Sequence, residues 1–255
     1  MITPAEINRR NREHYGQEPG PPTPVPYERR FVAYIDILGW KRACCDPTEY
    51  ARVSAVAKTL SELPRNFSRD LKDRLQHIKG AVSDSSHQKT EVVTLSDSLV
   101  ISTPVDVGYM HLFKFLTIVC RRLLTDKFLT RGGVTVGNLY HEENMVFGPA
   151  LIEAVALEQE EAIYPRILCS RDLVAEIECS QDCEPSDLKV TIIDHLGRSV
   201  INLLAFEQGN PAAWPDLVKR TIDTIALDNL PDKELEKWRY MRDVLQMMIQ
   251  CADQR

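Results

Sequence analysis

The 255-residue sequence has no apolar run long enough to span a membrane and no excess of positive charge. Its formal net charge of -6 argues against a basic surface for nucleic acid. The amino terminus lacks the charged, apolar and small-residue order of a secretory leader. We therefore expect a cytoplasmic protein that binds neither a membrane nor a nucleic acid.

The sequence also lacks the paired CxxC doublets of a structural zinc site, although it has seven cysteines. Cys44 and Cys45 are adjacent, and Cys179 and Cys183 lie four positions apart. A metal site at Cys179 and Cys183 is less favoured than two ordinary thiols, because a second pair is missing. The simplest interpretation is a set of reduced thiols.

What is present is the composition of a globular protein, with 44% hydrophobic and 27% charged residues. The length is ample for one large domain with appendages. The stretch "EPGPPTPVP" cannot form a helix interior or a central strand, so residues 1–26 are predicted to be an extended arm. The main domain is predicted over 27–205, and a helical extension over 206–255 is expected to pack on that domain or at a dimer interface.

Apolar periodicity and turn residues divide the main domain into strands and helices. Asp46, Pro47 and Glu49 resemble a capping box at the start of a helix that we expect to reach Leu63. Ser96-Asp97-Ser98 separate two β-rich runs, as in a hairpin. The expected elements are a strand at about 31–38, a helix at 47–63, a hairpin at 90–103, a helix at 109–128, strands at 131–140 and 145–147, and a helix at 150–162.

This order predicts an α+β fold with the split βαββαβ arrangement of ferredoxin-like proteins. An extra C-terminal hairpin is expected from "LKVTIID" and "RSVINLLAF", which flank His195-Leu196-Gly197. Two helices follow it. The last carries an apolar stripe that favours packing on the chain's own sheet over a dimer interface, and its residues are Trp238, Met241, Leu245 and Met248.

Two aspartates stand out in this arrangement. Asp36 interrupts the apolar run "RFVAYIDILGW", where an unpaired buried charge would be costly. Asp97 lies in the predicted hairpin, and the split topology brings it close to Asp36. Two converging carboxylates suit Mg²⁺ or Mn²⁺, which prefer oxygen ligands. A hairpin-turn role for Asp97 is the alternative.

Four motifs, in order and at similar spacing, resemble those of class III nucleotidyl cyclases. "YIDILGW" resembles the first-strand motif of that family and "TLSDSLVIS" its hairpin motif. "RGGVTVG" is similar to its Arg-x-Gly strand, and "MVFGPALIEAVALE" to its final glycine-led helix. The resemblance covers about residues 31–170 and implies a nucleotidyl cyclase catalytic domain within 27–205.

The resemblance implies that Asp36 and Asp97 are catalytic ligands of two divalent metal ions, Mn²⁺ or Mg²⁺. The backbone carbonyl of Ile37 would join one ion, and the amides of Leu38, Gly39 and Trp40 would face the triphosphate. The ribose 3′-hydroxyl would attack the α-phosphorus, and pyrophosphate would leave. Gly39 has no side chain to keep phosphate away from these amides.

The residues that read a purine in this family are replaced here. Val93 and Met145 occupy the two base-reading positions, and neither can hydrogen bond to a purine edge. Leu95, on the same hairpin as Val93, is a further candidate substrate-binding residue. Tyr34 points to the same sheet face as Asp36, so it could contact a small base, with a core tyrosine as the equal alternative. Trp40 could line the same base pocket, although a packing role for Trp40 is favoured.

The family's transition-state asparagine and arginine are also missing, because Ile152 and Ala156 take their positions. Another basic residue would have to stabilise the developing charge. Arg131 is the charge-stabilising candidate, and Arg166 and Arg198 are alternatives by strand position alone.

These departures are similar to those of the uridylate and cytidylate cyclases of bacterial Pycsar antiphage defence. That resemblance implies 3′,5′-cyclic UMP or CMP as product, sensed by a separate effector protein, with UTP preferred over CTP. The family's sites form between two domains, so a homodimer is expected. The alternatives are a purine cyclase with altered recognition and a degenerate domain that binds nucleotide without chemistry.

Overall fold

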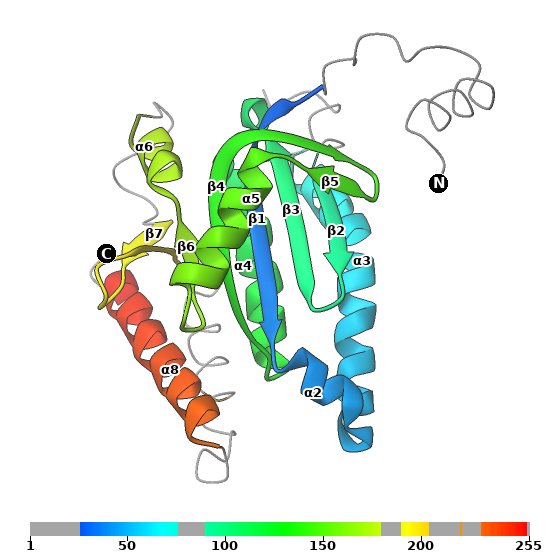
Figure 1. The fold of residues 1–255 in the computed structure, drawn as a ribbon, viewed down its shortest axis with the longest axis vertical. Coiled ribbons are helices and arrows are strands. Elements are labelled where there is room, and N and C mark those ends of the chain that lie inside the picture. Colours follow the sequence, from blue (N-terminus) through cyan, green and yellow to red (C-terminus); the bar gives the residue numbers. More distant parts are fainter. Residues whose placement is uncertain (1–25, 76–89, 180–189, 204–219, 221–230, 254–255) are drawn as a thin grey trace, which may run out of the picture.

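The structure is a computed structural model, and it describes residues 26–75, 90–179, 190–203, 220 and 231–253. The predicted arm before residue 26, the Cys183 thiol and the first of the two predicted tail helices lie outside the described residues. Within the described part, the fold is α+β, as the sequence predicts (Figure 1).

Four antiparallel strands form one side of the sheet, from its edge inward, in the order β2-β3-β1-β4. This is the predicted split arrangement, because β3 lies between β1 and β2, which are joined by a helical crossover. The strands are β1 (Glu28–Leu38), β2 (Glu91–Leu95), β3 (Ser98–Pro104) and β4 (Leu129–Glu142).

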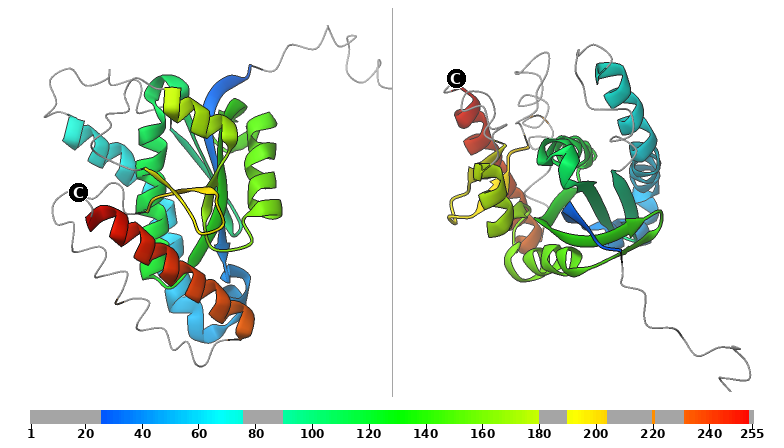
Figure 2. Two further views of the ribbon diagram at one scale, coloured as in Figure 1. Left: turned by 90° about the vertical axis from the view of Figure 1, so that its left-hand side faces the viewer. Right: turned by 90° about the horizontal axis from the view of Figure 1, so that it is seen from above.

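Helices cover both faces of the sheet (Figures 1 and 2). Helices α3 (Tyr50–Leu75) and α4 (Tyr109–Thr125) lie on one face, and α5 (Pro149–Ala156) lies on the other. Along β1, Phe31, Ala33, Ile35 and Ile37 belong to the main apolar core, whereas Val32 belongs to a smaller cluster with Ala150 of α5. Alternate residues of β1 therefore point to opposite faces, and Asp36 shares the α5 face with Val32.

Two glycines of β4 allow α5 to approach the sheet closely. A Cβ atom on Gly133 would lie 2.3 Å from the Ala154 carbonyl oxygen and 2.6 Å from the Leu157 Cβ. At Gly137 the nearest atom would be the Ala150 Cβ, at 3.2 Å. The sequence "RGGVTVG" thus sets how closely the helix after β5 packs above β4.

The predicted C-terminal hairpin extends the same sheet. Beyond β4 come β6 (Ile167–Cys169), β8 (Ser199–Ile201) and β7 (Thr191–Ile193). Helix α8 (Asp232–Asp253) packs against this extension. Its predicted stripe belongs to the main core, with side chains 2–7% exposed: Trp238, Met241, Leu245 and Met248. The core role of this stripe is therefore confirmed, and a dimer contact through it is not supported.

Several boundaries differ from the predictions. Pro47–Glu49 form a 3-10 turn, which Asp46 caps by accepting from the Thr48 amide at 2.9 Å, and α3 then continues to Leu75, beyond the expected Leu63. The helix expected over 150–162 ends at Ala156 and continues as a π-helical turn, Leu157–Glu161.

Other elements were not predicted. They are α2 (Trp40–Cys45), a 3-10 turn (Val105–Val107) and α6 (Arg171–Cys179), whose Leu173 amide donates to Ser170 Oγ at 3.1 Å. β5 (Met145–Phe147) pairs with the end of β4, as expected for a short strand.

The cysteines in the described part of the chain are free thiols: Cys44, Cys45, Cys120, Cys169 and Cys179. Burial raises the pKa of the Cys120 thiol to about 11 and that of Cys169 to about 12. The absence of a disulfide among these five cysteines is compatible with the sequence-based interpretation of reduced thiols. None of the helices among the described residues has both the length and the apolarity that a membrane crossing requires.

Candidate active site

The end of β1 and the tip of the β2–β3 hairpin meet, and this brings Asp36 and Asp97 together. Asp36 pairs with Ser98 in the β1–β3 register, and the Ile37 amide donates to the Asp97 carbonyl oxygen at 2.8 Å. Ser96 turns the hairpin with a φ of 58°. The backbone therefore holds the two predicted metal ligands next to each other.

Asp36 also lies directly opposite Arg131 in the β1–β4 register. Residues directly opposite in an antiparallel pair share a face, and the Arg131 Nε donates to Asp36 Oδ2 at 3.1 Å. The Asp36 side chain is 17% exposed, and burial raises its pKa, with partial compensation from the positive charge of Arg131. Of the three arginine candidates, Arg131 is therefore the one that reaches this carboxylate.

A third acid, Glu158, lies at this site and was not predicted from the sequence. Its side chain is 2% exposed, and its Oε1 lies 2.5 Å from the Arg131 Nε. Burial raises the pKa of Glu158, and the charges of Asp36 and Asp97 add to this effect. The available signal was spacing, since residue 158 follows Ala150 and Ala154 at intervals of four on the side of α5 that faces the sheet.

The other two arginine candidates lie in ion pairs elsewhere. Arg166 pairs with Asp194, which also accepts from the Tyr240 hydroxyl at 3.0 Å, and both charged side chains are buried. Arg198 pairs with Glu161 near the surface. Both arginines belong to the β6–β8 part of the molecule, where they connect the sheet extension to its surroundings.

Three of the predicted substrate-binding residues share the sheet face of Asp36. Tyr34 and Val93 both lie opposite Val100 of β3, and Leu95 lies opposite Ser98. Val93 is buried and Leu95 is 47% exposed. The Tyr34 hydroxyl hydrogen bonds to Ser98 Oγ at 2.8 Å, and its ring packs against the small apolar cluster. Tyr34 thus has a structural role whether or not it touches a base.

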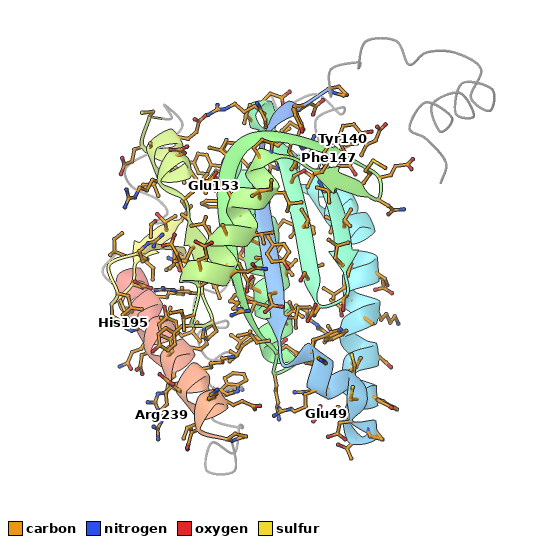
Figure 3. The ribbon with its side chains drawn as sticks, in the orientation of Figure 1. Glu49, Tyr140, Phe147, Glu153, His195 and Arg239 are labelled. Atoms are coloured by element: carbon orange, nitrogen blue, oxygen red, sulfur yellow. The ribbon has the colours of Figure 1, made fainter. Side chains whose placement is uncertain are left out.

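Met145 lies at the opposite end of the sheet from Asp36 in the same chain. It pairs with Glu142, eleven positions after Arg131, a path of about 35 Å along an extended strand. Figure 3 shows Tyr140 and Phe147 of this β4–β5 end at the top of the molecule and Glu49 at the bottom, the end at which β1 finishes. Because of this separation, Met145 does not contribute to the Asp36 site of its own chain, and its side chain is 60% exposed.

The turn after β1 leads directly into α2. Gly39 adopts a φ of 82° and is exposed, and a Cβ at this position would meet no atom within 4 Å. Leu38 and Trp40 are half-buried, and the Trp40 ring lies 5.4 Å from the Phe128 ring. Trp40 is therefore a packing residue here, which agrees with the favoured interpretation.

The two α5 positions that the sequence resemblance aligns with an asparagine and an arginine of class III cyclases carry no polar group toward the site. Ile152 is 72% exposed, and Ala156 has only a methyl side chain. Stabilisation of a charge that develops on a phosphate would therefore have to come from another residue of this chain. Arg131 is the candidate, because it contacts Asp36.

A divalent ion is compatible with the donors of this site. In the described part of the chain, no group of three or more histidine, cysteine, aspartate and glutamate side chains has the arrangement of a metal site. Asp36 and Asp97 supply two carboxylates, and Mg²⁺ commonly binds through one or two protein carboxylates with water and phosphate oxygens completing its shell. The donor set thus fits an ion whose remaining positions are filled by water or by the phosphate oxygens of a substrate.

Comparisons with known proteins add little to this picture. No family model matches the chain, and no curated protein is similar to it. A crystal structure described as an adenylate/guanylate cyclase/hydrolase from Silicibacter pomeroyi is similar at 16% sequence identity and a TM-score of 0.35. The match covers 69% of this chain and 95% of that chain. A similarity this low carries no argument about function.

Proposed function

We propose that this protein is a nucleotidyl cyclase that converts a ribonucleoside triphosphate to its 3′,5′-cyclic monophosphate and pyrophosphate. The observation that carries the proposal is the convergence of Asp36 and Asp97, held by the hydrogen bond from the Ile37 amide to the Asp97 carbonyl. The split sheet order and the four sequence motifs support the same proposal.

Each residue has a chemical role in this proposal. Asp36 and Asp97, with the Ile37 carbonyl, would hold two divalent ions. Such ions, when bound, lower the pKa of the ribose 3′-hydroxyl and neutralise phosphate charge. Arg131 would add a fixed positive charge beside the reacting phosphate. The turn Leu38-Gly39-Trp40, which is exposed at Gly39, would present backbone amides to the triphosphate, since Gly39 adds no side chain there.

We further propose a pyrimidine substrate, with UTP preferred over CTP. Val93 and Met145 cannot hydrogen bond to a purine edge, so a purine would leave its polar groups unpaired. The position of Met145, at the far end of the sheet, is compatible with a homodimer in which β5 of one protomer faces the Asp36 site of its partner. By the sequence resemblance, the cyclic product would act through a separate effector in antiphage defence.

A second candidate function is nucleotide binding without chemistry. The exposed Ile152 and the small Ala156 favour it, because α5 supplies no group for the transition state. The presence of two converging carboxylates weighs against it, since a binding domain has little need to hold both.

One experiment separates these candidates. The purified protein is incubated with each of the four ribonucleoside triphosphates and Mn²⁺ or Mg²⁺, and the products are identified by mass. Cyclic UMP as the main product supports the proposal, while cyclic CMP or a cyclic purine changes the substrate and keeps the enzyme class. The absence of any product from a folded protein that binds nucleotide would establish the second candidate.

A further inference from the structure

Arg131 Nε carries a single proton, and two carboxylates compete for it. The N–H donates to Asp36 Oδ2 at 3.1 Å, while Glu158 Oε1 lies closer, at 2.5 Å. Among the described residues, this Glu158 oxygen is buried and accepts no hydrogen bond. The contact between Glu158 and Arg131 is therefore an ion pair without an aligned hydrogen bond, and Arg131 is divided between two acids.

The two acids differ in how strongly they need the arginine. Glu158 is 2% exposed, whereas the Asp36 side chain is 17% exposed and lies next to Asp97 at the end of the strand. A buried carboxylate without a counter-charge is strongly unfavourable. Asp36 can accept a different cation from the Asp97 side, but Glu158 lies on the α5 side, where Arg131 is its counter-charge.

We propose that Glu158 is a positioning residue, which retains Arg131 when a divalent cation displaces that arginine from Asp36. The inference rests on the proposed function, because it requires a cation at Asp36 and Asp97. Glu158 is assigned no contact with substrate or metal; it acts through Arg131.

Arg131 and a divalent cation compete for the Asp36 carboxylate. A cation can use the Asp36 carboxylate only after the Arg131 contact opens, so its apparent affinity falls with the fraction of molecules in the open state. Glu158 raises that fraction, because Arg131 keeps one ion pair when it loses the other. The close packing of Leu157 over Gly133 fixes the turn that carries Glu158 at this distance from β4.

Direct binding of Mn²⁺ tests the proposal without any turnover. Free Mn²⁺ is counted by electron paramagnetic resonance in the absence of nucleotide, for the wild type, Glu158→Gln, Arg131→Gln and the double variant. Glu158→Gln is expected to weaken Mn²⁺ binding by about tenfold, the effect of one lost charge contact. Arg131→Gln is expected to bind at least as tightly as the wild type, and the double variant to match Arg131→Gln.

Two results would overturn the inference: one removes only the positioning role of Glu158, and the other removes the metal site itself. If Glu158→Gln weakens binding as much in the Arg131→Gln background as alone, Glu158 acts by its own charge or as a ligand, and only the positioning role is lost. If neither the wild type nor Arg131→Gln binds Mn²⁺, the metal site of the proposed function is itself wrong. Glu160→Gln is the matched control, since Glu160 lies on the same turn and is exposed; it should leave binding unchanged.

A second variant and a second measurement keep the proposal testable if Glu158→Gln folds poorly. Glu158→Asp keeps the charge and shortens the reach to Arg131, and it should also weaken Mn²⁺ binding in a way that Arg131→Gln reverses. In the wild type, the ¹⁵N-labelled Nε resonance of Arg131 should shift when Mg²⁺ is added, as its partner changes from Asp36 to Glu158. An unchanged Nε resonance at saturating Mg²⁺ would contradict the exchange.

Discussion

Asp36 and Arg131 lie directly opposite each other on β1 and β4, and the arginine Nε donates to the aspartate Oδ2. This pairing explains how an acid is tolerated in an otherwise apolar strand. It also places a positive charge beside the carboxylate that the sequence motifs predict to be a metal ligand.

Asp36→Asn and Asp97→Asn should each lower cation-dependent cyclic nucleotide formation by about a hundredfold or more, since even outer partners of metal ligands contribute about 10–100-fold. The measurement is initial rate against Mn²⁺ concentration. Asp46→Asn is the control, because asparagine is an equally good helix cap and Asp46 lies outside the site. Full activity in either site variant would refute the metal assignment.

Arg166 and Arg198 should both contribute to the stability of the fold, and Arg166 should contribute more. Arg166→Ala leaves buried Asp194 without its cation, so the free energy of unfolding should fall by about 3–5 kcal/mol. Arg198→Ala breaks a surface pair and should cost less than about 1 kcal/mol. Urea unfolding at pH 7 gives both values. A stable Arg166→Ala variant that has lost only activity would instead place this arginine in the chemistry.

Gly133→Ala should destabilise the protein by about 1–3 kcal/mol, because the added methyl group overlaps the Ala154 carbonyl and Leu157. Gly137→Ala is the matched substitution in the same strand, and it should cost less, since its nearest atom is 3.2 Å away. Thermal unfolding of the two variants provides the comparison. Equal stability would mean that α5 can move away from β4 without loss.

His141 should make the protein acid-sensitive. Burial, together with the nearby charge of Arg30, lowers the pKa of His141 to about 4, and its Nδ1 lies 2.8 Å from Ser102 Oγ. The unfolded chain takes up this proton near pH 6.5, so the native state is fully stable above that pH and loses stability as the pH falls to 4. At about 1.4 kcal/mol per pKa unit, the loss is about 3 kcal/mol.

The measurement is the free energy of unfolding between pH 7 and pH 4, for the wild type and His141→Gln. The variant should show a flatter pH dependence, even if it is less stable at pH 7. An identical slope in both proteins would show that other groups control the acid sensitivity.

The fold was largely predictable, because its signals are local. The apolar run in "RFVAYIDIL", the turn at Ser96-Asp97 and the order of the elements are sufficient to predict the split sheet. The position of β6 was not predictable, since a three-residue strand carries almost no periodicity. The same holds for the π-helical turn after α5, which continues a helical pattern with different hydrogen bonds.

The site was predictable only in part. Asp36 and Asp97 are visible in the sequence as acids in β-rich surroundings, and the resemblance of their motifs predicts a metal-binding role for both. Arg131, Arg166 and Arg198 could not be distinguished, because each is an arginine near a strand. Glu158 could be assigned to a helix face by spacing, but its partner could not be named.

From the sequence alone came the main strands and helices of the split sheet, the places of the two aspartates along them and, through the family resemblance, the prediction that Val93 and Met145 replace polar base-reading groups. The tertiary structure alone decided that Arg131 stands between Asp36 and Glu158. The reason is physical: that contact depends on the register of β1 against β4 and on how closely α5 packs over Gly133. Both are long-range pairings, which no local pattern encodes.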